Sequence, residues 1–256
     1  MYHDVVTGGD LDVSGFSGAG PAHYKLDRAA FAEHLDRVAD AMRRPPVPVG
    51  SLAGGAQADG SWSITFDDGG ASATDIAEEL DRRSWRGDFF IVTDRIGERG
   101  FLSADAIRAL DAAGHGIGSH SRTHPRRLGS RPVPEILDEW RSSADALSSL
   151  LGHPVTTASV PGGWYSRDVA RAAATAGLQV LCTSEPVRRV SRVDGCMVVG
   201  RGAIERDTPA ATAVGFATGE TRVWLSAWAA WNARKVAKTL AGGRYEQVRA
   251  ALLARR

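Results

Sequence analysis

Residues 61–70 read SWSITFDDGG, an apolar, strand-like run that ends in two aspartates and two glycines. Glycine lets the backbone turn sharply, so Asp67 and Asp68 are expected at the carboxyl end of a strand over residues 62–66. An isolated Asp-Asp-Gly is commonly only a turn or a helix cap. The segment therefore predicts a strand that presents two carboxylates, and other parts of the chain must decide whether they bind a ligand.

Strands alternate with amphipathic helices along most of the chain. This alternation favours parallel strands joined by right-handed crossovers, and hence an α/β sheet or barrel with its ligands at the carboxyl ends of the strands. We expect one domain over residues 1–256, in which residues 221–256 form a helical extension broken at Gly242-Gly243. The predicted strands cover residues 1–6, 62–66, 87–93, 114–120, 155–160, 179–183 and 196–200, and the predicted helices cover 26–42, 73–83, 134–152, 166–177 and a segment that opens at Ser103.

Composition narrows the class of partner. The chain carries 31 basic and 30 acidic residues, so no long-range field attracts nucleic acid, and a neutral or compact substrate is expected. Cys182 and Cys196 are too few to staple a chain of this size and are interpreted as reduced core thiols, although a disulfide between them stays open. Because the chain shows no basic leader and no run of eighteen apolar residues, we expect a cytoplasmic protein without a membrane span.

A second polar segment, GIGSHSRTHPRR at residues 116–127, follows another short apolar strand. His120 and His124 are four residues apart, a spacing that places two imidazoles on one side of a helical turn. Taken alone, the pair is equally well read as exposed or capping histidines. Together with a carboxylate at an equivalent strand end, it predicts a three-ligand site of the catalytic zinc type, with one position open for water.

The order of TFDDG and SHSRTH resembles the first two motifs of the polysaccharide deacetylases, the NodB-homology group of carbohydrate esterases. The resemblance implies a distorted (β/α) barrel and metal-dependent removal of N-acetyl groups from amino sugars. It also implies that Asp68, His120 and His124 hold the metal while Asp67 is the general base. The general-base role of Asp67 is also chemically reasonable, since a carboxylate beside an activated water can accept its proton.

The family's third motif, Arg-x-Pro-x-Gly, aligns with SVPGG at residues 159–163, where Ser159 stands in place of the arginine that normally orients the base. Arg201, at the end of a late strand, is the candidate replacement, with an exposed or substrate-contacting arginine as the alternative. Gly162 follows the proline of the motif. The resemblance implies that its N–H group helps to bind the oxyanion.

The family's last element is a histidine on a late strand, and this chain has no histidine after His153. A circularly permuted subset, typified by poly-N-acetylglucosamine deacetylases, carries that strand first, and residues 1–6, MYHDVV, resemble it. The resemblance implies that His3 is the general acid, on a first strand that lies beside the strand of Asp67. An imidazole titrates near neutrality, which suits protonation of a departing amine. A frayed terminal histidine is the alternative.

Three further residues are weaker candidates for substrate binding. Trp164 and Tyr165 follow the third motif, where their rings could contact a sugar or pack in the core. Glu185 lies at the end of a predicted strand and could contact substrate.

The carboxy-terminal tryptophans 224, 228 and 231 are spaced as one stripe of a helix. Such a stripe is typically a buried seam, while a contact in a homo-oligomer and a membrane-surface face are the alternatives.

These observations leave three functional hypotheses. The first is a metal-dependent amidohydrolase that removes acetyl, or alternatively formyl, from an amino sugar or a sugar-containing small molecule. The second retains the metal but acts on a non-sugar amide or cyclic imide, and the third is a non-catalytic carbohydrate-binding descendant. Two histidines and one carboxylate favour Zn²⁺, and they also suit Fe²⁺, Co²⁺ and Ni²⁺.

Overall fold

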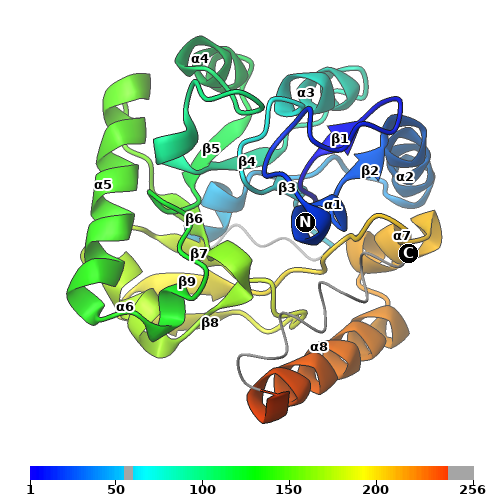
Figure 1. Cartoon of the computed structure of the whole chain (residues 1–256). Coiled ribbons are helices and arrows are strands. Elements are labelled where there is room, and N and C mark those ends of the chain that lie inside the picture. The colour runs from blue at the N-terminus through cyan, green and yellow to red at the C-terminus, as the bar shows by residue number, and fades with distance from the viewer. Residues whose placement is uncertain (55–59, 242–256) are drawn as a thin grey trace.

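The computed structural model describes residues 1–54 and 60–241, which fold as an α/β half-barrel with helices on its outer side (Figure 1). The predicted break at Gly242-Gly243 lies outside these residues. The strands are β1 (Val5–Val6), β2 (Leu26–Asp27), β3 (Thr65–Phe66), β4 (Asp88–Ile91), β5 (Gly116–Ser119), β6 (Thr157–Ser159), β7 (Val180–Cys182), β8 (Ser191–Val193) and β9 (Cys196–Val199). The α-helices are α1 (Ala19–Ala22), α2 (Arg28–Ala41), α3 (Ala73–Asp81), α4 (Ala104–Ala112), α5 (Val133–Leu151), α6 (Arg167–Thr175), α7 (Ala210–Thr218) and α8 (Thr221–Ala241).

One curled sheet in the order β3-β4-β5-β6-β7-β9-β8 forms the half-barrel. All neighbouring strands are parallel except β8 and β9, so the carboxyl ends of β3 to β7 and β9 meet at one rim. The predicted α/β architecture is confirmed. Strand β8 was not predicted, although Asp194-Gly195 between β8 and β9 has positive φ at both residues, the usual signature of a tight hairpin.

The amino-terminal segment lies beside β3, as predicted. The Tyr2 N–H donates to the Thr65 carbonyl at 2.8 Å, and the Asp67 N–H donates to the Tyr2 carbonyl at 3.0 Å. The predicted strand over residues 1–6 is shorter than expected, because only Val5–Val6 continues as β1 and pairs with β2 rather than with the main sheet. His3 is therefore held by the backbone pairing of its neighbour at the carboxyl end of β3.

Local caps decide where the helices begin. The Asp27 carboxylate accepts from the Ala29 N–H at 2.8 Å, so α2 starts at Arg28, and Leu26 belongs to β2 instead of the predicted helix. Ser103 caps α4 as predicted, with its hydroxyl accepting from the Ala106 N–H at 3.2 Å. Apolar faces of these helices cover the sheet and exclude water from it.

The carboxy-terminal helices α7 and α8 extend the half-barrel, and α7 packs near α2 (Figure 1). The prediction that the tryptophan stripe of α8 is buried is wrong at Trp228. This side chain is 48% exposed, because no described element covers that side of the helix. Trp224 is half-buried and donates its Nε1–H to the Phe216 carbonyl at 3.3 Å. None of the helices in residues 1–54 and 60–241 combines the length and apolar character needed to cross a bilayer.

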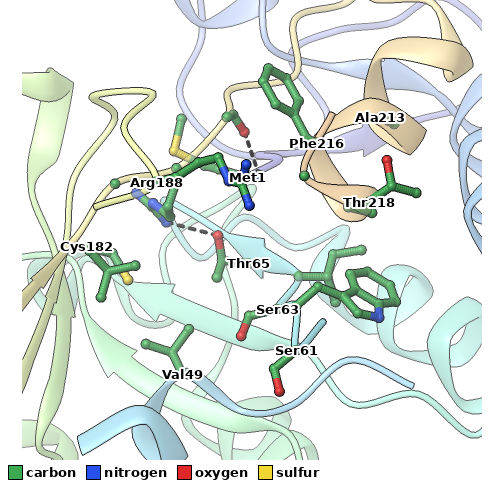
Figure 2. Close-up of a pocket in the computed structure, with 18 of the residues that line it drawn as sticks. Met1, Val49, Ser61, Ser63, Thr65, Cys182, Arg188, Ala213, Phe216 and Thr218 are labelled. Carbon is green, nitrogen blue, oxygen red and sulfur yellow. Dashed lines mark hydrogen bonds between the residues drawn. The ribbon is translucent and has the colours of Figure 1, made fainter. Parts of the chain in front are cut away.

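A cavity of about 360 Å³ lies between the segment before β3, the segment after β9 and helix α7 (Figure 2). Its walls are mostly apolar and include Val49, Cys182 and Phe216, and Thr65 and Arg201 contribute polar groups. Cys182 is buried and, like Cys196, carries a free thiol, in agreement with the reduced interpretation. The aspartates that follow β3 do not line this cavity, but Arg201, which does, lies at the carboxyl end of β9.

Candidate active site

The carboxyl ends of four strands converge on one set of polar side chains. Asp67 and Asp68 follow β3, His120 follows β5, Ser159 ends β6 and Arg201 follows β9. All five are buried, although water would solvate such groups better than an apolar core. Buried polar groups at this density require mutual pairing or a bound ion.

Asp68, His120 and His124 form a group of potential metal ligands. Their nearest ligand atoms lie within 4.8 Å of one another, and the Nε2 atoms of the two histidines lie 3.3 and 3.6 Å from the Asp68 Oδ1. Burial would raise the pKa of Asp68, but the neighbouring histidines lower it to about 2, so its carboxylate is ionised at neutral pH. Burial lowers the pKa of His124 to about 4, which leaves a neutral imidazole. One carboxylate and two imidazoles suit Zn²⁺ and related divalent metals, so the residues fit the implied group.

His120 is oriented by the end of β6. Its Nδ1 lies 3.0 Å from the Ser159 carbonyl oxygen and 2.5 Å from the Ser159 hydroxyl. With a metal bound, a proton on Nδ1 would donate to the carbonyl and leave the Nε2 lone pair for the metal. This arrangement is the usual way in which a protein orients a histidine toward a metal.

The two histidines approach each other through a loop, and the predicted helical turn is wrong. Ser121 and His124 both have left-handed backbone conformations, with φ of 66° and 57°, which a helix does not contain. Glu139 on α5 holds the loop, because its carboxylate accepts from the N–H groups of Arg122 and Thr123 at 2.9 and 2.8 Å. Sequence reasoning missed Glu139, since one acid on a helix has no local signal of such a role.

Asp67 forms a buried, bidentate ion pair with Arg201. The guanidinium Nη1 and Nη2 lie 2.8 and 2.7 Å from the two carboxylate oxygens. Arg201 also donates to the Thr65 hydroxyl at 2.9 Å and to the Thr183 carbonyl at 3.1 Å. Burial is the largest single influence and would raise the pKa of Asp67, but the charge and hydrogen bonds of Arg201, together with the nearby histidines, hold that pKa far below its usual range. Arg201 is 6% exposed, so the alternative of a surface arginine is wrong.

Ser159 stands where the family motif has arginine, and both Ser159 and Arg201 contact the Asp67 carboxylate. The Ser159 hydroxyl donates to the Asp67 Oδ1 at 3.1 Å, the same oxygen that Arg201 contacts through Nη1. The positive charge beside the aspartate therefore comes from the end of β9 instead of the end of β6.

His3 lies near both aspartates. A positive charge on its ring would lower the pKa of Asp67 and of Asp68, although burial is the largest influence on each. The ring is tilted by 38° against the Tyr24 ring, with centroids 4.7 Å apart, and its Nδ1 is buried without a hydrogen-bond partner in the described part of the chain. An unpartnered, buried ring nitrogen is unusual and leaves His3 without a hydrogen bond at that atom among the described residues.

The acid after His3 has a structural role. Asp4 is buried and its Oδ1 accepts from the hydroxyls of Ser14 and Ser72 at 2.5 and 2.8 Å. A Cβ atom on Gly70 would overlap this carboxylate. The second glycine of FDDGG is therefore required by the close approach of Asp4.

The remaining candidates for oxyanion and substrate binding differ in how far they are buried. Gly162 is exposed in the loop after β6, with φ of 60°, and Trp164 in the same loop is half-buried, with the Arg127 guanidinium 5.0 Å from its ring centroid. Tyr165 packs against the core under α5 and α6, which favours the packing alternative over a sugar contact. Glu185 is half-buried, and its Oε1 lies 3.6 Å from the Lys235 Nζ on α8.

Helix α8 also reaches the third-motif loop. A Cβ atom on Gly163 would lie 2.7 Å from the Trp231 ring, so the tryptophan packs directly on that glycine. The sequence indicated a stripe of tryptophans but not which member contacts the loop, because the packing of α8 depends on residues far away in the chain.

Sequence comparisons identify known relatives of this arrangement. The model of the polysaccharide deacetylase family matches residues 54–181, half of the chain. A putative polysaccharide deacetylase of Bacillus subtilis, YheN, is 28% identical over 101 residues, which is 39% of this chain and 34% of that protein. The chain spans about a third of the length of the curated relatives it matches.

Solved structures share the fold at low sequence identity. The deacetylase PplD of Streptococcus pyogenes, determined in complex with acetate, superposes with a TM-score of 0.70 at 15% identity over 84% of this chain and 95% of that chain. IcaB of Ammonifex degensii superposes with a TM-score of 0.63 at 22% identity over 83% of this chain and 97% of that chain. The family match over half of the sequence and the shared half-barrel agree, and the chain belongs to the polysaccharide deacetylase family.

Proposed function

We propose that the protein is a divalent-metal-dependent deacetylase that hydrolyses the N-acetyl amide of an amino sugar or a sugar-containing small molecule. The observation that carries the proposal is the convergence of Asp68, His120 and His124 beside the paired carboxylate of Asp67. A site used only for carbohydrate binding would not require that second carboxylate next to a metal. Family membership supports the reaction class, and Zn²⁺ is the proposed metal.

Asp68, His120 and His124 would hold the metal, and each has a position suited to this role. A bound divalent cation supplies Lewis acidity toward the acetamide carbonyl and lowers the pKa of water. Asp67 accepts the proton of the attacking water, and Arg201 keeps that carboxylate ionised and oriented. The Gly162 N–H donates to the oxyanion, and His3 donates a proton to the departing nitrogen. The products are acetate and a free amine.

The function is tested by acetate release. We expect the purified protein to release acetate from N-acetylglucosamine oligomers or nucleotide-linked N-acetyl sugars, and a chelator to abolish this release, because the metal supplies the electrophile. Adding back Zn²⁺, Co²⁺, Ni²⁺ or Fe²⁺ separately identifies the metal that restores the rate. Chelator-resistant release would contradict the proposed metal dependence, and no release from any N-acetyl sugar would contradict the proposed substrate class.

The role of His3 is tested with leaving groups of different basicity. His3→Ala is expected to lower kcat for an N-acetyl sugar about 10²- to 10⁴-fold, because the amine leaves only when protonated. The same variant should lose far less activity toward p-nitrophenyl acetate, whose leaving group needs no proton. His153→Ala is the matched control, since that histidine is exposed and pairs with Asp111 away from the site. Equal losses on both substrates would show that His3 is not the proton donor.

A further inference from the structure

The two imidazoles of the proposed metal site are held in different ways. His120 has 2% side-chain exposure and contacts the Ser159 carbonyl through Nδ1. His124 has 22% side-chain exposure, and within residues 1–54 and 60–241 only its backbone N–H is hydrogen-bonded, to the Ser121 hydroxyl at 3.1 Å. A metal-binding histidine is usually oriented by a hydrogen bond at its second ring nitrogen. The His124 ring therefore needs another support.

Phe16 supplies a packing contact to this ring. The centroids of Phe16 and His124 are 4.8 Å apart with an interplanar angle of 41°. Phe16 is itself packed edge-on against Phe101 at 5.1 Å, and the Arg95 guanidinium lies 5.5 Å from its ring centroid. Phe16 thus has little freedom to move away from His124. The left-handed backbone of His124 adds to the need for such a support, because this conformation is unfavourable without surrounding contacts.

Lys25 holds the loop that carries Phe16. Its side chain is buried, and its Nζ donates to the carbonyl oxygens of Leu11, Ser14 and Phe16 at 2.5, 2.6 and 2.6 Å. Three donated hydrogen bonds use all three protons of an ammonium group, so Lys25 is charged in the folded protein. The loop is held a second time where the Ser14 hydroxyl donates to Asp4.

We propose that Lys25 and Phe16 are positioning residues that set the metal affinity of the site. Lys25 fixes the loop over residues 7–18, the loop fixes Phe16, and Phe16 restricts the His124 ring to the orientation in which Nε2 faces Asp68. The inference rests on the proposed function, because it presupposes that these residues bind a metal. It concerns residues outside the three deacetylase motifs.

The experiment measures the Zn²⁺ dissociation constant by competition with a chromogenic chelator. Phe16→Ala is expected to weaken Zn²⁺ binding about 10- to 100-fold, the usual effect of removing a group that orients a metal ligand. Phe16→Leu should lose less, because it retains part of the packing. Val13→Ala is the matched control, since Val13 lies in the same loop with 52% exposure. Thermal unfolding of the metal-free proteins separates a local effect from general destabilisation.

A double-mutant cycle tests the link to Lys25. Lys25→Met is expected to weaken Zn²⁺ binding. Because Lys25 acts through Phe16, the double variant Lys25→Met/Phe16→Ala should have the same Zn²⁺ affinity as the single variant that binds Zn²⁺ less tightly. Wild-type affinity in Phe16→Ala would overturn the inference, and additive losses would overturn the part assigned to Lys25. If Lys25→Met does not fold, the two Phe16 variants decide the result. A wild-type protein that binds none of Zn²⁺, Co²⁺, Ni²⁺ and Fe²⁺ would overturn the proposed function itself, which distinguishes the two failures.

Discussion

Asp67→Asn is expected to lower kcat at least about 10³-fold while one divalent metal remains bound per chain. The amide cannot accept the proton of the attacking water, and a general base contributes about 10²- to 10⁴-fold to the rate. The loss should lie towards the upper end, because no other described residue beside the three ligands is a carboxylate held by an arginine as Asp67 is. Metal retention is expected because Asp67 is not among those ligands. Acetate release and metal content, measured on the same preparation, test both expectations.

The matched control is Asp88→Asn on the neighbouring strand β4. Asp88 is as deeply buried as Asp67, and burial raises its pKa to about 7, so a neutral amide resembles the protonated acid. We expect the control variant to retain wild-type turnover. If Asp67→Asn retained more than about a tenth of the wild-type kcat, the assignment of the base would be wrong. Loss of both metal and turnover would instead place Asp67 in the metal site.

Replacing Arg201 with glutamine is expected to destabilise the protein by about 3–5 kcal/mol and to impair turnover. Removal of one partner leaves the Asp67 carboxylate buried without its charge partner, a change that typically has this magnitude. The Thr65 hydroxyl and Thr183 carbonyl lose a donor as well. Chemical denaturation of the wild-type and variant proteins at pH 7 measures the difference in the free energy of unfolding.

The destabilisation should depend on pH with a defined sign. In the wild-type protein the pKa of Asp67 lies below its unfolded value of 3.8, so the pair contributes stability above about pH 4 and loses it only as the pH falls toward the folded pKa. Without Arg201, burial is the main remaining influence and raises the pKa of Asp67 above the unfolded value. The variant should therefore lose stability as the pH rises from about 4 toward 7, and its difference from wild type should be larger at pH 7 than at pH 4. The acid limb of its rate profile should move to higher pH. A difference that is equal at the two pH values would contradict this account.

The group of candidate metal ligands was predictable because each member follows a short strand in a motif of a few residues. Asp68 comes after β3, and His120 and His124 come after β5, so parallel pairing brings them to one rim. The loop geometry that joins the two histidines was not predictable from their spacing, since it depends on left-handed residues and on Glu139 from α5.

By itself, the sequence determined the alternation of strands and helices, the two aspartates and two histidines at strand ends, and the position of the amino-terminal segment with His3 beside β3. These features follow from local periodicity and short motifs. Only the tertiary structure decided that Arg201 pairs with Asp67 across 134 positions of the chain, that Tyr165 packs in the core, and that Phe16 lies against His124. Contacts between residues so far apart leave no periodic pattern, because they depend on how separate elements pack together.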